Sequence, residues 1–140
     1  EGYYFMPGAA ELIHRLYGKC RLFIVTNGTA RVQQGRIADA GIARYFDGIF
    51  ISELLGADKP RKAFFDACFA QIPDFRKSET ALIGDSLSSD ICGGKAAGLY
   101  TIWYNPRREA LPENGVKPDK IIADLAEIPA LCGIPLEEDA

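Results

Sequence analysis

Residues 80–90 read TALIGDSLSSD, and this stretch decides the fold class. The uncharged run 80–83 is typical of a strand that is buried on both faces of a parallel sheet. It ends at Gly84 and Asp85, and small residues suited to a helix follow over 88–97. Ligands of open α/β sheets bind outside the carboxyl ends of the strands, so Asp85 stands where a functional carboxylate is expected.

The same alternation of strand and helix patterns extends along the chain on both sides of this stretch. Further strands are predicted over 22–25, 48–51, 100–103 and, as a short edge strand, 121–122. Further helices are predicted over 8–18, 29–40, 61–71 and from Asp124 to about 132, and residues 105–118 are expected to form a surface loop. This alternation predicts an α/β fold: a three-layer, Rossmann-like parallel sheet with helices on both faces.

Composition limits the class of protein. With 140 residues and a net charge of −3, the chain has the size of one domain and no excess of basic residues, so no nucleic-acid partner is expected. No apolar run approaches the roughly 20 residues that span a bilayer, so we expect no membrane partner. The cysteines form no CxxC pair, and we expect buried free thiols in a cytoplasmic protein. They are Cys20, Cys68, Cys92 and Cys132.

Polar residues follow the run 22–25 at the point where that strand should end. Thr26 can donate its hydroxyl to a phosphate oxygen, and Asn27 and Gly28 lead into the next helix. Backbone N–H groups at a helix start also favour an anion. The alternative is an ordinary N-terminal capping turn, a common use of these residue types.

Two further polar groups stand at predicted strand ends or helix starts. Lys59 precedes Pro60 and can reach across the strand ends to neutralise a phosphate, although most lysines are simply solvated. Asp85 is placed to ligate a hard cation such as Mg²⁺, and Asp90 can support that site or pair with Lys59. The alternative for both acids is a favourable interaction with the start of the following helix.

All three groups occur in order along the chain, and together they carry a resemblance. The chain resembles the haloacid-dehalogenase-like (HAD) hydrolase superfamily from Pro7 to Leu131. The strongest matches are residues 24–28 (IVTNG), 56–60 (GADKP) and 83–90 (IGDSLSSD), which correspond to its second, third and fourth motifs. Residues 45–47, 51–53, 89–91 and 93–94 are similar to those of capped subfamily I, and the chain is most similar there to the pyrimidine-type 5′-nucleotidases.

The resemblance implies a magnesium-dependent phosphatase of small phosphate monoesters, with nucleoside monophosphates as the expected substrates. It implies that Thr26, Lys59 and Asp90 are catalytic residues, that Thr26, Asn27, Gly28 and Lys59 bind phosphate, and that Asp85 and Asp90 hold Mg²⁺. It also implies an aspartate nucleophile in a DxDxT motif after the first strand. No such motif follows an apolar run between Glu1 and Ala140.

We therefore expect residues 1–140 to form a partial core domain with motifs II to IV, without the first strand and the helical cap. The resemblance places that strand between the strands that end at Thr26 and Asp85. The chain is expected to be inactive alone and to need a second chain, an upstream segment or a second copy for the strand. The alternative functions are a 2-haloacid dehalogenase and a truncated, non-catalytic fragment that binds phosphate or a partner.

Overall fold

The computed structural model describes residues 8–133, so both ends of the domain expected over 1–140 lie outside the described residues. Five short strands are present: β1 (Phe23–Thr26), β2 (Gly48–Ile51), β3 (Ala81–Gly84), β4 (Tyr100–Tyr104) and β5 (Lys120–Ile122). The α-helices are α1 (Ala9–Leu16), α2 (Ala30–Ala40), α3 (Ser52–Leu55), α4 (Lys62–Ala70), α5 (Cys92–Ala96) and α6 (Ile128–Leu131). Three single 3-10 turns and one π-helical turn, η3 (Leu87–Ile91), complete the regular structure of this part of the chain.

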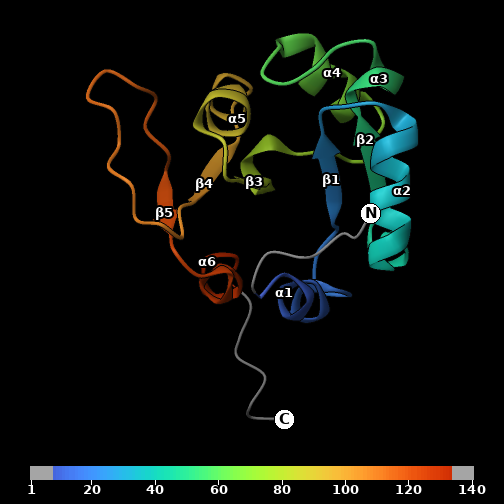
Figure 1. Ribbon diagram of the computed structural model, residues 1–140, viewed down its shortest axis with the longest axis horizontal. Coiled ribbons are helices and arrows are strands. Elements are labelled where there is room, and N and C mark those ends of the chain that lie inside the picture. Colours follow the sequence, from blue (N-terminus) through green and yellow to red (C-terminus); the bar gives the residue numbers. More distant parts are fainter. Residues whose placement is uncertain (1–7, 134–140) are drawn as a thin grey trace.

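The strands form two parallel sheets, which confirms the predicted α/β class (Figure 1). In the first sheet β1 pairs with β2, from Phe23 opposite Gly48 to Thr26 opposite Ile51. In the second sheet β4 lies between β3 and β5, with Ala81 opposite Tyr100 and Ile102 opposite Lys120. Within residues 8–133, no strand lies between β1 and β3.

Two apolar clusters cover opposite faces of the strands. Leu82 packs into a cluster with Phe64 and Phe65 of α4, and this cluster also contains Phe50 of β2. Ile83, which follows Leu82 in β3, packs against the other cluster. That cluster is built around α1, β4, β5 and α6. Successive side chains of a strand point to opposite faces, so α4 and the pair α1 and α6 cover opposite sides, as a three-layer fold requires.

The helix expected over 88–97 is divided into η3 and α5. The N–H groups of Asp90 and Ile91 both donate to the Ser86 carbonyl, at 3.0 Å and 3.1 Å, and the bond from Ile91 gives the wider π-helical turn. The predicted final helix is also divided, into a 3-10 turn and α6, although Asp124 caps it as expected. Helix α3 follows β2 directly and was not predicted.

The prediction of buried cysteines is wrong for three of the four thiols. Cys68 is buried within α4, whereas Cys20, Cys92 and Cys132 are exposed. Apolar neighbours in the sequence do not fix which side of a short helix or turn faces the core. Burial raises the pKa of the Cys68 thiol to about 12, so this thiol stays protonated at neutral pH.

No helix among the described residues is both long enough and apolar enough to cross a membrane.

Candidate active site

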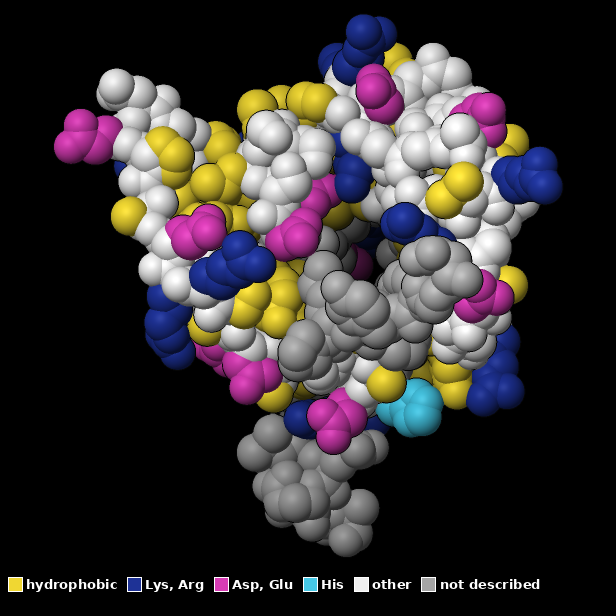
Figure 2. Space-filling model, in the orientation of Figure 1, with side chains coloured by type: hydrophobic (Ala, Val, Ile, Leu, Met, Phe, Trp, Pro, Cys, Tyr) yellow, Lys and Arg dark blue, Asp and Glu magenta, His cyan; other side chains and the backbone are white. Residues whose placement is uncertain are grey.

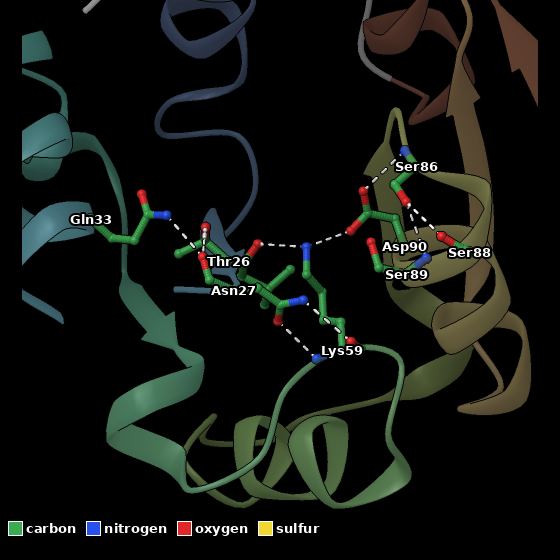
Figure 3. A network of polar contacts seen from close by, with 9 residues as sticks. Thr26, Asn27, Gln33, Lys59, Ser86, Ser88, Ser89 and Asp90 are labelled. Atoms are coloured by element: carbon green, nitrogen blue, oxygen red, sulfur yellow. Dashed lines mark hydrogen bonds and ion pairs between the residues drawn. The ribbon is translucent and has the colours of Figure 1, made fainter. Parts of the chain in front are cut away.

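Lys59 lies between the carboxyl ends of β1 and β3 (Figure 3). Its ammonium group donates to the Val25 carbonyl of β1 at 3.3 Å and to Asp90 Oδ1, beyond β3, at 2.5 Å. The Lys59 and Asp90 side chains are each 10% exposed, so water screens this ion pair only weakly. An ammonium group has three N–H donors, and one has no partner among residues 8–133.

Asn27 holds the backbone of Lys59 through both ends of its side-chain amide. Its Oδ1 accepts the Lys59 N–H at 2.8 Å, and its Nδ2 donates to the Lys59 carbonyl at 3.2 Å. The Asn27 carbonyl in turn accepts a hydrogen bond from Gln33 Nε2 at 2.8 Å. The side chain expected to bind phosphate is therefore engaged in positioning the lysine.

Asp90 approaches the end of β3 so closely that only glycine fits there. A Cβ atom at Gly84 would overlap the Asp90 carboxylate. Asp90 Oδ2 accepts the Ser86 N–H at 3.3 Å, while Oδ1 binds Lys59. Both carboxylate oxygens thus have protein donors, and the side chain is buried with its charge compensated.

Asp85 has a fixed backbone and an open carboxylate. The indole N–H of the buried Trp103 donates to the Asp85 carbonyl at 3.1 Å. The Asp85 side chain is exposed and makes no hydrogen bond or ion pair within the described part of the chain. This environment leaves its oxygens available to a cation.

Magnesium is the metal that the predicted chemistry requires, and the donor set fits it. Mg²⁺ is typically held by one or two carboxylates and takes its other ligands from water and phosphate oxygens. Asp85 offers such a carboxylate, and Asp90 lies one turn away with its oxygens bound to Lys59 and Ser86. Residues 8–133 contain no cluster of three or more His, Cys, Asp or Glu side chains that could form a complete protein cage.

The start of α2 is occupied by protein contacts. The Gly28 N–H donates to Ser52 Oγ at 2.8 Å, and the Ala30 N–H donates to Glu53 Oε1 at 2.7 Å. These donors were expected to face a phosphate. Among the described residues, the Thr26 hydroxyl at the end of β1 donates only to the neighbouring Asn27 carbonyl, at 3.2 Å, and it can rotate toward a ligand.

Sequence reasoning did not assign a role to Ser52, Glu53 or Gln33, which tie the loop after β1 to its neighbours. The sequence signal that could have identified Ser52 and Glu53 is their position directly after the strand predicted over 48–51. Only the tertiary structure shows that they bind the loop after β1, some two dozen residues earlier in the chain.

Comparison with known proteins identifies the class. The sequence profile of the haloacid dehalogenase-like hydrolases matches residues 1–98. The chain therefore belongs to the haloacid dehalogenase-like hydrolase family.

Several bacterial relatives are similar in sequence. The chain is 45% identical to HAD-hydrolase YfnB of Bacillus subtilis over 106 residues, which are 76% of this chain and 45% of YfnB. It is 37% identical to pyrimidine 5′-nucleotidase YjjG of Escherichia coli, covering 90% of this chain and 56% of YjjG. Pyrimidine 5′-nucleotidase PynA of Streptococcus pneumoniae is 44% identical, over 72% of this chain and 43% of PynA. The chain spans about half the length of these relatives.

Solved structures agree with the assignment to the haloacid dehalogenase-like hydrolase family. A crystal structure of YfnB bound to magnesium superposes with a TM-score of 0.91 at 39% identity, covering 95% of this chain and 58% of that one. A 2-haloacid dehalogenase from Pseudomonas syringae pv. Tomato superposes with a TM-score of 0.81 at 29% identity, covering 93% and 54%. A magnesium-bound HAD hydrolase and a dehalogenase thus share this fold, so the fold alone does not identify the reaction.

Proposed function

We propose that the chain supplies the phosphate and magnesium half of the active site of a phosphatase that hydrolyses pyrimidine nucleoside monophosphates. The observation that carries this proposal is the cluster at the carboxyl ends of β1 and β3. There the Lys59 ammonium group is held by Val25 and Asp90, and the exposed Asp85 follows β3 directly. The pyrimidine preference is supported by the names of two relatives, YjjG and PynA.

Each residue has a distinct role in this proposal. The Lys59 N–H that has no partner within residues 8–133, together with the Thr26 hydroxyl, donates to oxygens of the transferring phosphoryl group. Asn27 fixes Lys59, Gly28 lets the loop turn toward Ser52, and Asp90 holds the lysine ammonium group in place. Asp85, supported by Asp90, holds Mg²⁺, which supplies positive charge against the phosphate oxygens.

The attacking aspartate is proposed to lie outside residues 1–140. Neither Asp85 nor Asp90 fits that role, because Asp90 is engaged by Lys59 and Ser86 and Asp85 is assigned to the metal. Phosphoryl transfer through an aspartyl-phosphate requires this additional carboxylate. We therefore expect the 140 residues alone to release no phosphate.

Assay of the protein expressed from its complete coding sequence tests the proposal. We expect Mg²⁺-dependent phosphate release from uridine and thymidine monophosphates, faster than from purine nucleotides or sugar phosphates, and loss of activity with EDTA. Chloride release from 2-chloropropionate without metal would instead assign the protein to the dehalogenases. Absence of turnover with every ester would favour the non-catalytic binding fragment.

Substitution of Lys59 tests the site itself against a matched lysine. Lys59→Ala should lower kcat by at least about a hundredfold, as expected when a charged group that stabilises the transition state is removed. Lys62→Ala is the control, because Lys62 is only three residues away but is exposed and pairs with Asp66. Equal effects of the two substitutions would contradict the assigned role of Lys59.

A further inference from the structure

Helices α1 and α6 pack against each other, although they belong to distant parts of the chain (Figure 1). Helix α1 precedes β1 of the first sheet, and α6 follows β5 of the second sheet. Leu16 at the end of α1 and Ile128 at the start of α6 are buried in the same apolar cluster. The contact between these helices is therefore one of the places where the two halves of the molecule meet.

A cysteine lies one helical turn beyond each of these two buried residues. The Cys20 N–H donates to the Leu16 carbonyl at 3.3 Å, and the Cys132 N–H donates to the Ile128 carbonyl at 3.1 Å. Both cysteines are exposed, with free thiols, and both line one cavity of about 1030 Å³. Figure 2 shows the surface hollowed between the two halves of the molecule. The packing of Leu16 with Ile128 thus brings both thiols to the same side of the helix pair.

The two thiols also influence each other electrostatically. Partial desolvation raises the pKa of the Cys20 thiol, and negative charge on Cys132 and on Asp47 raises it further. Interactions between charges in water fade over about 10 Å, so this effect agrees with neighbouring sulfur atoms. Desolvation also raises the pKa of the Cys132 thiol. The thiolate is the reactive form, so these shifts slow oxidation of the pair without preventing it.

We propose that Cys20 and Cys132 are a redox modification site, which a small-molecule disulfide such as oxidised glutathione converts into an intramolecular disulfide. The thiolate of one cysteine attacks a sulfur atom of the oxidant, whose S–S bond breaks and releases one glutathione thiolate. The second cysteine then attacks the mixed disulfide, which forms the Cys20–Cys132 bond and releases the other glutathione thiolate. The two released thiolates take up the two protons that the cysteines lose, so two protein thiols are oxidised and one oxidant disulfide is reduced.

The disulfide has a structural consequence because of where its ends lie. It joins the segment before β1 to the end of α6, and both sheets lie within the covalent loop that it closes. A cross-link that closes a long loop stabilises a protein mainly by restricting the unfolded chain. Exposed disulfides are also the ones that are readily reduced again. The oxidation state of the pair therefore sets how firmly the two halves of the molecule are held together.

Oxidation of the protein expressed from its complete coding sequence tests the proposal. The reduced protein is incubated with oxidised glutathione at about pH 8.5, where a usable fraction of the thiols is ionised. Mass mapping of the unreduced digest should find the Cys20 and Cys132 peptides joined in a monomer, with the loss of two hydrogen atoms. The Tm should rise by at least about 5 °C and return to its original value after reduction with dithiothreitol.

Matched serine substitutions assign the effect to the pair. Cys20→Ser and Cys132→Ser should each remove both the cross-linked peptide and the rise in Tm. Cys92→Ser is the control, because Cys92 is also exposed but lies at the start of α5, and it should leave both results unchanged. Oxidation in urea should no longer favour this pair, because unfolding separates the two helices.

Four outcomes would overturn the proposal. In the first, both thiols stay free or carry glutathione without a bond between them. In the second, either cysteine pairs instead with Cys92, with a cysteine outside the 140 residues or with a second molecule. In the third, the bond forms equally well in urea, and in the fourth it forms without raising the Tm. Cys20 precedes the amino end of β1 whereas Lys59 lies at its carboxyl end, so none of these measurements depends on phosphatase activity.

Discussion

Asn27 and Gly84 show how much of the site depends on single small residues. Asn27 uses both amide atoms on the backbone of Lys59, and Gly84 leaves the space that the Asp90 carboxylate occupies. Neither residue needs to touch a substrate to matter. Both act by holding the Lys59–Asp90 pair at the ends of β1 and β3.

Asn27→Ala should lower kcat of the intact enzyme by about ten- to thirtyfold with a smaller change in KM. The substitution removes two hydrogen bonds of about 1 kcal/mol each, so Lys59 is less well placed when charge develops on the phosphoryl group. Steady-state kinetics measures the effects on kcat and on KM separately. Asn114→Ala in the exposed surface loop is the control, and a change confined to KM would indicate that Asn27 contributes only to substrate binding.

Gly84→Ala should destabilise the protein by about 1–3 kcal/mol and abolish most of the activity, because the added methyl group displaces the Asp90 carboxylate. Gly35→Ala is the matched control. It adds the same methyl group at a helical position with no atom within 4 Å, and it should stabilise by about 0.5–1 kcal/mol. Thermal unfolding of both variants measures the contrast, and a neutral Gly84→Ala would contradict the close approach described here.

At the scale of the elements, the turn η3 after β3 places the two acids differently. Its π-helical hydrogen bonding from Ile91 to Ser86 accompanies a buried Asp90, while Asp85 stays exposed at the end of the strand. Trp103 of the neighbouring strand β4 anchors the start of this turn through the Asp85 carbonyl. Such turns are frequent at functional sites.

Trp103→Phe should raise the Mg²⁺ concentration needed for half-maximal activity by about fivefold, since one hydrogen bond of about 1 kcal/mol no longer fixes the Asp85 backbone. Metal titration by calorimetry provides a second measurement that is independent of turnover. Tyr100→Phe, at an exposed position of the same strand, should leave both values unchanged. An unaltered Mg²⁺ affinity in Trp103→Phe would contradict the proposed link between β4 and the proposed metal site.

At the scale of the whole molecule, polar contacts join segments distant in sequence around the second sheet. Asp119 accepts hydrogen bonds from the Thr101 N–H at 2.8 Å and from Lys95 Nζ at 2.8 Å, which links α5, β4 and the segment before β5. The Lys95 ammonium and the Thr101 backbone lower the pKa of Asp119 below its usual value. This carboxylate is partly exposed, so its contribution to stability is modest.

Asp119→Asn should lower the Tm of the intact protein at neutral pH, and the difference from the unsubstituted protein should shrink in acid. Because the folded-state pKa is depressed, the stabilisation is complete above the unfolded-state pKa of about 4 and is lost as pH falls through the lower folded-state value. Thermal unfolding from neutral pH to about pH 3 covers this range. Asp66→Asn, in an exposed pair with Lys62, serves as control, and a Tm difference that grows in acid would have the wrong sign.

Sequence patterns predict the α/β class, the family, and the order of the strands and of every α-helix except α3, because strand and helix periodicity and the three motifs are local properties. The strand predicted over 48–51 has the same bounds as β2. The bounds of the other predicted strands differ from the observed bounds by no more than one residue. The roles of Thr26, Lys59, Asp85 and Asp90 remain predictions, although the structure brings Lys59 and Asp90 together. The tertiary structure is needed to show that Asn27 and the start of α2 are engaged by Lys59, Ser52 and Glu53, and that β1 and β3 do not pair with each other within residues 8–133. Those facts depend on contacts between segments about 20 to 60 residues apart, which no local pattern specifies.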